Sequence, residues 1–168
     1  FEELRKTQLA DETVLSNIKE LWNKLTSLES KTLANYYLRN RTKLQLDENA
    51  LIWTKALEKL RYKMDISRGG DARQYPGVEN SLVSIGLLSL AERAAVNNYL
   101  AGSIREHEMT DLIEGFRSNL KRKIADLSKN PAVSLEDAKT IATVYSESEA
   151  LTEKLINTHR DYRVEQAE

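Results

Sequence analysis

The chain has 168 residues, of which 40% are apolar, and 25 basic residues against 26 acidic ones give a formal net charge of −1. One domain of this length buries a core without disulfides, and the absence of cysteine excludes a disulfide scaffold and a cysteine-bound zinc module. The near-neutral charge argues against nucleic-acid binding, and six glycines and two prolines are too few for a turn-rich all-β fold.

The first predicted element is a long amphipathic helix over residues 4–40. Five apolar residues recur along it at alternating spacings of four and three: Val14, Ile18, Leu21, Leu25 and Leu28. This spacing is typical of a seam that packs in helical bundles. We expect a second helix from Asp47 to Ser67 and then a loop from Gly69 to Gly77, where Gly and Pro interrupt the pattern.

The helical pattern resumes at Val78 and continues to Leu127, with a kink expected at Gly102. A second loop covers residues 128–133, and Ser134 followed by acidic residues predicts the N-cap of a last helix. The predicted fold class is all-α: an elongated antiparallel helical bundle of four long elements, or five helices if Gly102 is a turn. No apolar run reaches the ~18 residues that a membrane-spanning helix needs.

An internal repeat relates residues 28–38 to residues 90–100. The aligned pairs share apolar, basic, amide and aromatic character: Leu28 with Leu90, Lys31 with Arg93, Asn35 with Asn97, Tyr37 with Tyr99 and Leu38 with Leu100. The match at polar and aromatic positions favours a duplicated element, although chance similarity between two helices is the alternative interpretation.

The repeat also supplies the candidate site. Asn35 and Asn97 continue apolar seams, so both amides are predicted to point inward, where an unpaired amide costs about 1–3 kcal/mol. Lys31 and Arg93 lie one helical turn earlier on the same side. Two such pairs would form a donor-rich pocket for a small anion.

Aromatic residues would wall this pocket: Tyr37, Tyr99 and Trp53. In the alternative interpretation, the asparagines only set helix register and the basic side chains extend into solvent.

Other polar clusters carry weaker signals. His107 lies among acidic residues, and we interpret it, His159 and the basic run that begins at Arg117 as solvated surface. No Ser-His-Asp set, paired-carboxylate motif or phosphate loop stands out. We therefore expect no enzymatic activity, no cofactor and no metal site.

The segment from Glu92 to Gly102, ERAAVNNYLAG, resembles the second Glu-Arg helix of bacterial nitrate- and nitrite-sensing (NIT) domains. The first copy of the repeat departs from that pattern, because Glu29-Ser30-Lys31 replaces the Glu-Arg pair. The resemblance spans residues 28–127 and is shared with other four-helix receptor modules.

This resemblance implies a periplasmic (extracytoplasmic) sensor domain over residues 1–168, excised from a transmembrane chemoreceptor, histidine kinase or related receptor. Its ligand would be nitrate, nitrite or a small carboxylate, bound between helices by Lys31, Asn35, Tyr37, Arg93, Asn97 and Tyr99, and binding would displace the last helix. A homodimer is expected, with membrane contact only through flanking segments. The alternative function is a helical adhesion or secretion-system protein that binds a protein partner.

Overall fold

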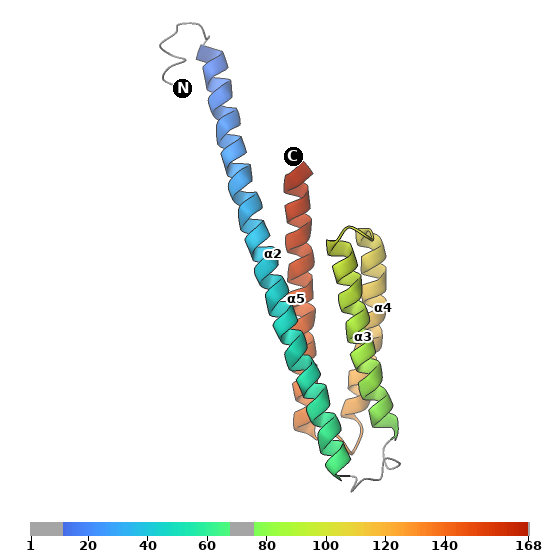
Figure 1. Cartoon of the computed structure of the whole chain (residues 1–168). Helices are drawn as coiled ribbons and strands as arrows, with labels where there is room; N and C mark the ends of the chain where they lie inside the picture. The colour runs from blue at the N-terminus through green and yellow to red at the C-terminus, as the bar shows by residue number, and fades with distance from the viewer. Residues whose placement is uncertain (1–11, 68–75, 168) are drawn as a thin grey trace. The chain divides into compact units, whose positions relative to one another are not determined.

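The structure, a computed structural model, describes residues 12–67 and 76–167, with side chains described from residue 14 to 64 and from 77 to 164. Four helices account for nearly all of these residues (Figure 1): α2 (Glu12–Ser67), α3 (Pro76–Leu100), α4 (Glu106–Ser128) and α5 (Leu135–Ala167). The described residues contain no strand. The predicted all-α fold with four helices is confirmed.

The boundaries between the helices differ from the prediction at residues 41–46. Helix α2 passes through this stretch without a break, so a separate helix beginning at Asp47 is wrong. The stretch contains no glycine or proline that would interrupt the helix, and its side chains Thr42 and Leu46 are buried. Burial of side chains within the expected break therefore favours one continuous helix.

The prediction of a kink at Gly102 is also wrong, because the chain turns there. Gly102 has a φ of 74°, in the left-handed region that favours glycine. Its N–H donates to the Tyr99 carbonyl at 2.9 Å, and the Ser103 N–H donates to the Asn98 carbonyl at 2.8 Å. Helices α3 and α4 thus become neighbours joined by a short turn, and the total remains four helices (Figure 1).

The predicted N-cap of the last helix is confirmed. The Asp137 backbone N–H donates to the Ser134 hydroxyl oxygen at 3.1 Å, just ahead of the first turn of α5. In the preceding loop, the Ala132 N–H donates to the Asn130 side-chain oxygen at 3.0 Å. Such local side-chain bonds replace the intrahelical partners that are missing at a helix start.

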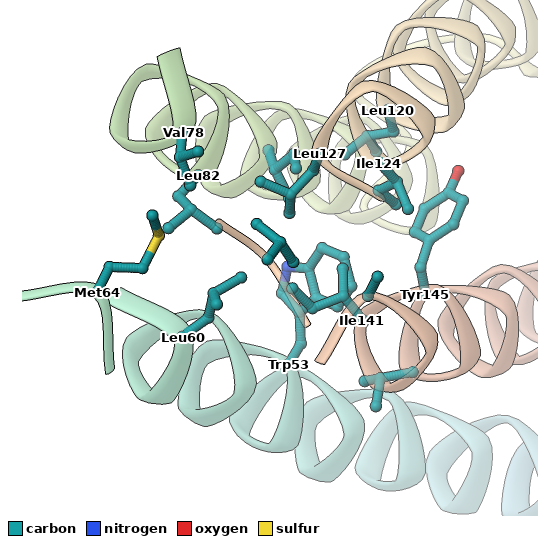
Figure 2. Close-up of a cluster of buried hydrophobic side chains, with 14 residues drawn as sticks. Trp53, Leu60, Met64, Val78, Leu82, Leu120, Ile124, Leu127, Ile141 and Tyr145 are labelled. Carbon is teal, nitrogen blue, oxygen red and sulfur yellow. The ribbon is translucent and has the colours of Figure 1, made fainter. Parts of the chain in front are cut away.

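The residues form two compact units: Phe1–Arg41 with Thr158–Glu168, and Thr42–Asn157. In the second unit, all four helices contribute to one hydrophobic cluster (Figure 2). The labelled members are Trp53, Leu60, Met64, Val78, Leu82, Leu120, Ile124, Leu127, Ile141 and Tyr145. A second cluster in this unit includes Leu46, Val96, Tyr99, Met109, Ile113 and Leu155.

The face of α3 that packs differs from the predicted one. The apolar seam that Asn97 was expected to continue inside the bundle consists of Val83, Leu87 and Leu90, and these residues are 52–63% exposed. The buried series is Val78, Leu82, Ile85, Glu92, Val96 and Tyr99. Two apolar rows lie side by side on this helix, and the core takes the row that carries Ile85 and Tyr99. The residues of the other row, which were predicted to point inward, therefore face the solvent.

The predicted seam at the start of α2 is not covered either. Its first four members, Val14, Ile18, Leu21 and Leu25, are all exposed. The described part of the chain therefore does not bury this face of the helix.

Candidate ligand-binding site

The six predicted site residues fall into the two compact units. Lys31, Asn35 and Tyr37 lie on α2 in the first unit, where Lys31 and Tyr37 are exposed and Asn35 is half-buried. Arg93, Asn97 and Tyr99 lie on α3 in the second unit. A pocket that combines the two sets stays a prediction.

On α3 the structure corrects two of the predicted roles. Asn97 is exposed, so the prediction that its amide points inward is wrong. The face of α3 that packs lies beside the predicted seam. Tyr99 is fully buried in the second hydrophobic cluster, and its hydroxyl lies 3.4 Å from the Glu106 carboxylate. Arg93 is half-buried and borders a groove, so it is the predicted residue of α3 that meets a cavity.

This groove, of about 260 Å³, lies between α2 and α3 in the second unit. Its α2 side consists of Ala50, Trp53, Thr54, Leu57, Glu58 and Arg61, and its α3 side of Leu82, Val83, Gly86, Ser89, Leu90 and Arg93. Most of the lining is apolar, as is common in small-molecule sites with a few polar anchors. Trp53 also belongs to the core beneath the groove (Figure 2).

Small residues on α3 leave room for the groove. Gly86 faces it, and a Cβ added there would meet no atom within 4 Å. Ser89 follows one turn later on the same side. Glycine and serine inside a helix that otherwise carries leucine and valine were a sequence signal for an open face, and the predicted seam did not include them. Trp53, by contrast, was among the expected aromatic walls.

An ion pair joins the two helices at each end of the groove. Arg93 Nη2 lies 2.6 Å from Asp47 Oδ1, and Arg61 Nη2 lies 3.2 Å from Glu79 Oε1. On α2 the lining extends from Ala50 to Arg61. This separation of eleven residues corresponds to roughly 16 Å along the helix. A small ligand can therefore meet one guanidinium at a time.

The two guanidiniums differ in their exposure. The Arg93 side chain is 27% exposed, whereas that of Arg61 is 61% exposed. A less solvated charge interacts more strongly with an anion. Arg93 is therefore the better anchor.

Trp53, one of the residues that line the groove, carries a buried hydrogen-bond donor. Trp53 is almost fully buried, and its indole Nε1 has no hydrogen-bond partner within the described residues. A buried donor without a partner costs about 1–3 kcal/mol. The indole nitrogen is itself buried, so it is not a contact point for a ligand in the groove.

A separate charge cluster connects α3, α4 and α5, and corrects the interpretation of Arg117 as solvated surface. Arg117 is largely buried, and its Nε donates to Glu92 Oε1 at 2.7 Å. It also pairs with Glu153, and Lys121 lies 2.7 Å from Glu149. Three carboxylates around two cations give a net negative site, which does not favour an anionic ligand.

The pKa shifts in this cluster follow from burial and pairing. Burial raises the pKa of the Glu92 carboxyl, and the opposing effect of Arg117 does not cancel this rise. Burial alone would lower the pKa of Arg117, but its hydrogen bonds to Glu153 and Glu92 outweigh burial and raise it. The cluster therefore holds helices together rather than presenting a free charge.

In the first unit, His159 is buried rather than solvated as expected. Its Nδ1 lies 3.3 Å from Arg39 Nη1, and the Arg39 guanidinium lies 4.9 Å from the centre of the Tyr162 ring. Burial lowers the pKa of His159, and the nearby Arg39 and Arg163 lower it further. This contact links α2 and α5 within the first unit.

Comparison with known proteins gives no relative: no family model, no curated protein and no solved structure matches this chain. Across residues 12–67 and 76–167, no helix is long and apolar enough to cross a membrane. No group of three or more metal-ligating side chains occurs in the same residues.

Proposed function

We propose that this chain is a ligand-binding sensor module of a bacterial transmembrane receptor, which binds a small anionic molecule with an apolar body between α2 and α3. The observation that carries the proposal is the groove itself, with an apolar lining that ends at the half-buried Arg93. The lining favours a carboxylate with a carbon skeleton over nitrate or nitrite, because an inorganic ion leaves apolar surface without contact.

The ion pair at Arg93 suggests how binding would be passed on. A ligand carboxylate at Arg93 competes with Asp47, which is half-exposed and lies on α2. Helices α2 and α5 both continue from the second unit into the first. A ligand that favours one arrangement of α2 against α3 shifts that equilibrium by its difference in affinity for the two states. In this proposal, the module lies on the extracytoplasmic side of the membrane.

Thermal unfolding in the presence of a ligand panel tests the proposal. The panel contains nitrate, nitrite, acetate, benzoate and a medium-chain fatty acid. We expect the aromatic or aliphatic carboxylates to raise the melting temperature of the wild type and to do so much less in Arg93→Ala. Arg61→Ala is the matched control, because it removes the ion pair at the other end of the groove. No response to any member of the panel, or equal responses in both variants, contradicts the proposal.

A second pair of variants tests the groove without changing charge. Gly86→Leu places a side chain in the groove, and Gly115→Leu makes the same change on the exposed face of α4, where an added Cβ also meets nothing within 4 Å. Both variants gain helix propensity, by about 1 kcal/mol. Only Gly86→Leu is expected to abolish the ligand response.

The alternative function, a helical interaction protein with a protein partner, is favoured by a different observation, the exposed apolar seam of α2. The two functions predict different behaviour of the Gly86→Leu variant. A protein that acts only through the α2 seam keeps its activity when the groove is filled.

A further inference from the structure

The first half of α2 exposes an apolar seam that a soluble helix does not usually leave open. Val14, Ile18, Leu21 and Leu25 recur at spacings of four, three and four residues, and they are 41–65% exposed. Trp22 stands beside this row and is 64% exposed. A contiguous apolar row of this kind marks an interaction surface.

The spacing identifies the geometry of the partner. Apolar residues that repeat every 3.5 residues on average form the seam of a left-handed coiled coil. In heptad terms, Ile18 and Leu25 occupy a positions, and Val14, Leu21 and Leu28 occupy d positions. The heptad with Ile18 at a and Leu21 at d has the combination that favours two-stranded coiled coils.

Charges beside the seam decide the identity and direction of the partner. Lys24 occupies a g position and Glu29 the following e position. In a parallel pair of identical helices, each g residue faces the e residue of the next heptad in the other copy, so that Lys24 faces Glu29 twice. In an antiparallel pair, g faces g, and Lys24 and Lys31 approach like charges.

Among the described residues, Lys24 makes only a solvated contact, and Glu29 is exposed. Lys24 pairs with Glu20 at 2.8 Å, but both side chains are about two-thirds exposed at 66% and 65%. Such an exposed pair contributes little and exchanges readily. Lys24 can therefore turn to a partner at small cost.

We infer that residues 14–29 of α2 form a parallel, in-register two-stranded coiled coil with the same residues of a second copy of this chain. The apolar part of the seam covers about two heptads, because it continues with the polar Thr32 and Asn35. This length is short for isolated peptides, which must also form the helix. Here the helix is already part of α2, so that association has only to cover the seam. The inference is independent of the groove.

Single cysteine variants test the arrangement, because the natural chain contains no cysteine. A parallel in-register pair places every seam residue opposite itself, so Val14→Cys and Leu28→Cys should both give disulfide-linked dimers on mild oxidation. These positions lie about 21 Å apart along the helix, so an antiparallel pair can bring at most one of them opposite itself. Asn23→Cys, on the outer face at an f position, is the control and should remain monomeric.

Sedimentation equilibrium of the unmodified chain gives the second test. We expect a concentration-dependent monomer–dimer equilibrium that Leu21→Asp abolishes while the helix content stays unchanged, because Leu21 is exposed. Lys24→Glu should weaken the dimer about tenfold, since two pairs turn repulsive, and the double variant Lys24→Glu/Glu29→Lys should restore it. A monomer at every concentration, cross-linking at one of the two d positions alone, or failure of the double variant to restore association overturns the inference.

Discussion

The two halves of α2 carry one pattern and have opposite surroundings. A series of positions at alternating spacings of four and three runs from Val14 to Leu60, with polar residues between Thr32 and Thr42. In the second half its members are 0–5% exposed at Thr42, Leu46, Asn49, Trp53 and Leu60. In the first half, Val14, Ile18, Leu21 and Leu25 are exposed although they form the more apolar set, and the members from Leu28 to Arg39 are half-buried.

The difference teaches that hydrophobic periodicity identifies a contact face and leaves open what covers it. In the second unit, α3, α4 and α5 share a hydrophobic cluster with α2, and even the polar Thr42 and Asn49 of this half are buried. From Val14 to Leu25, the described residues supply no such cover. A second copy of the same helix does so in our proposal.

The largest expected effect is a difference between the two halves in how far a Leu→Ala substitution lowers the free energy of unfolding. Leu60→Ala removes a buried side chain and should lower the free energy of unfolding by about 2–5 kcal/mol, with a fall in melting temperature on the order of 10 °C. Leu21→Ala makes the same change on the same helix and should alter stability by no more than about 0.5 kcal/mol in dilute solution. Urea unfolding followed by circular dichroism measures both. Equal losses would show that the first half of the seam is covered within one chain.

An increase in the free energy of unfolding is expected for a substitution at Thr42. Its side chain is fully buried, and its hydroxyl has no hydrogen-bond partner within the described residues. Thr42→Val keeps the shape and removes the unpaired hydroxyl, so the free energy of unfolding should rise by about 1 kcal/mol. Thr26→Val is the matched control in the first half, where the hydroxyl is exposed and donates to the Trp22 carbonyl. A loss of stability in Thr42→Val would indicate that the hydroxyl has a partner in solution.

A smaller effect, visible as pH dependence, is expected at His159, which contacts Arg39 between the two halves of α2. The pKa of His159 lies below the ordinary value of 6.5. The unfolded chain therefore binds the proton more tightly, and His159 contributes stability that is complete above pH 6.5 and is lost as the pH falls below it. Melting temperatures measured between pH 7.5 and 5 should fall less in His159→Gln than in the wild type. His107→Gln, which replaces an exposed histidine, should follow the wild-type curve.

The smallest expected effect concerns the exposed pair of Glu20 and Lys24. Glu20→Ala should leave the melting temperature of the monomer unchanged within error, because both side chains are solvated. Lys63→Ala, which breaks the pair with the largely buried Asp137 at 2.7 Å, should lower stability by up to about 1 kcal/mol. A larger effect at Glu20 than at Lys63 would place the first half of α2 in a less solvated setting than the structure gives it.

Local signals predicted part of the architecture correctly. The cap at Ser134 was recognisable because a hydroxyl residue precedes acidic residues in the first turn, and the structure has that hydrogen bond. Gly102 was recognised as an interruption, but sequence did not distinguish a kink from a turn. That choice depends on α3 packing against α4, which involves residues far from Gly102 in the chain.

Some of the residues that line the groove could also be named from the sequence. Arg93 and Trp53 were expected at a ligand pocket and both line the groove, whereas the exposed Asn97 and the buried Tyr99 do not. The error has one cause, since α3 has two adjacent apolar rows and only packing selects between them. His159 and Arg117 were misjudged for a related reason: a charged or titratable residue is buried when a partner from another helix neutralises or contacts it.

By itself the sequence determined that this protein is helical, where its last helix begins, and that the first part of α2 carries an apolar seam. These properties arise from residues within a few turns of one another, so local spacing and capping suffice. Tertiary structure decided the reversal at Gly102, the packed row of α3, the groove beside Trp53 and the burial of Arg117. Each of these depends on which surfaces of distant helices meet, because burial free energy is gained only when two complementary faces exclude water together.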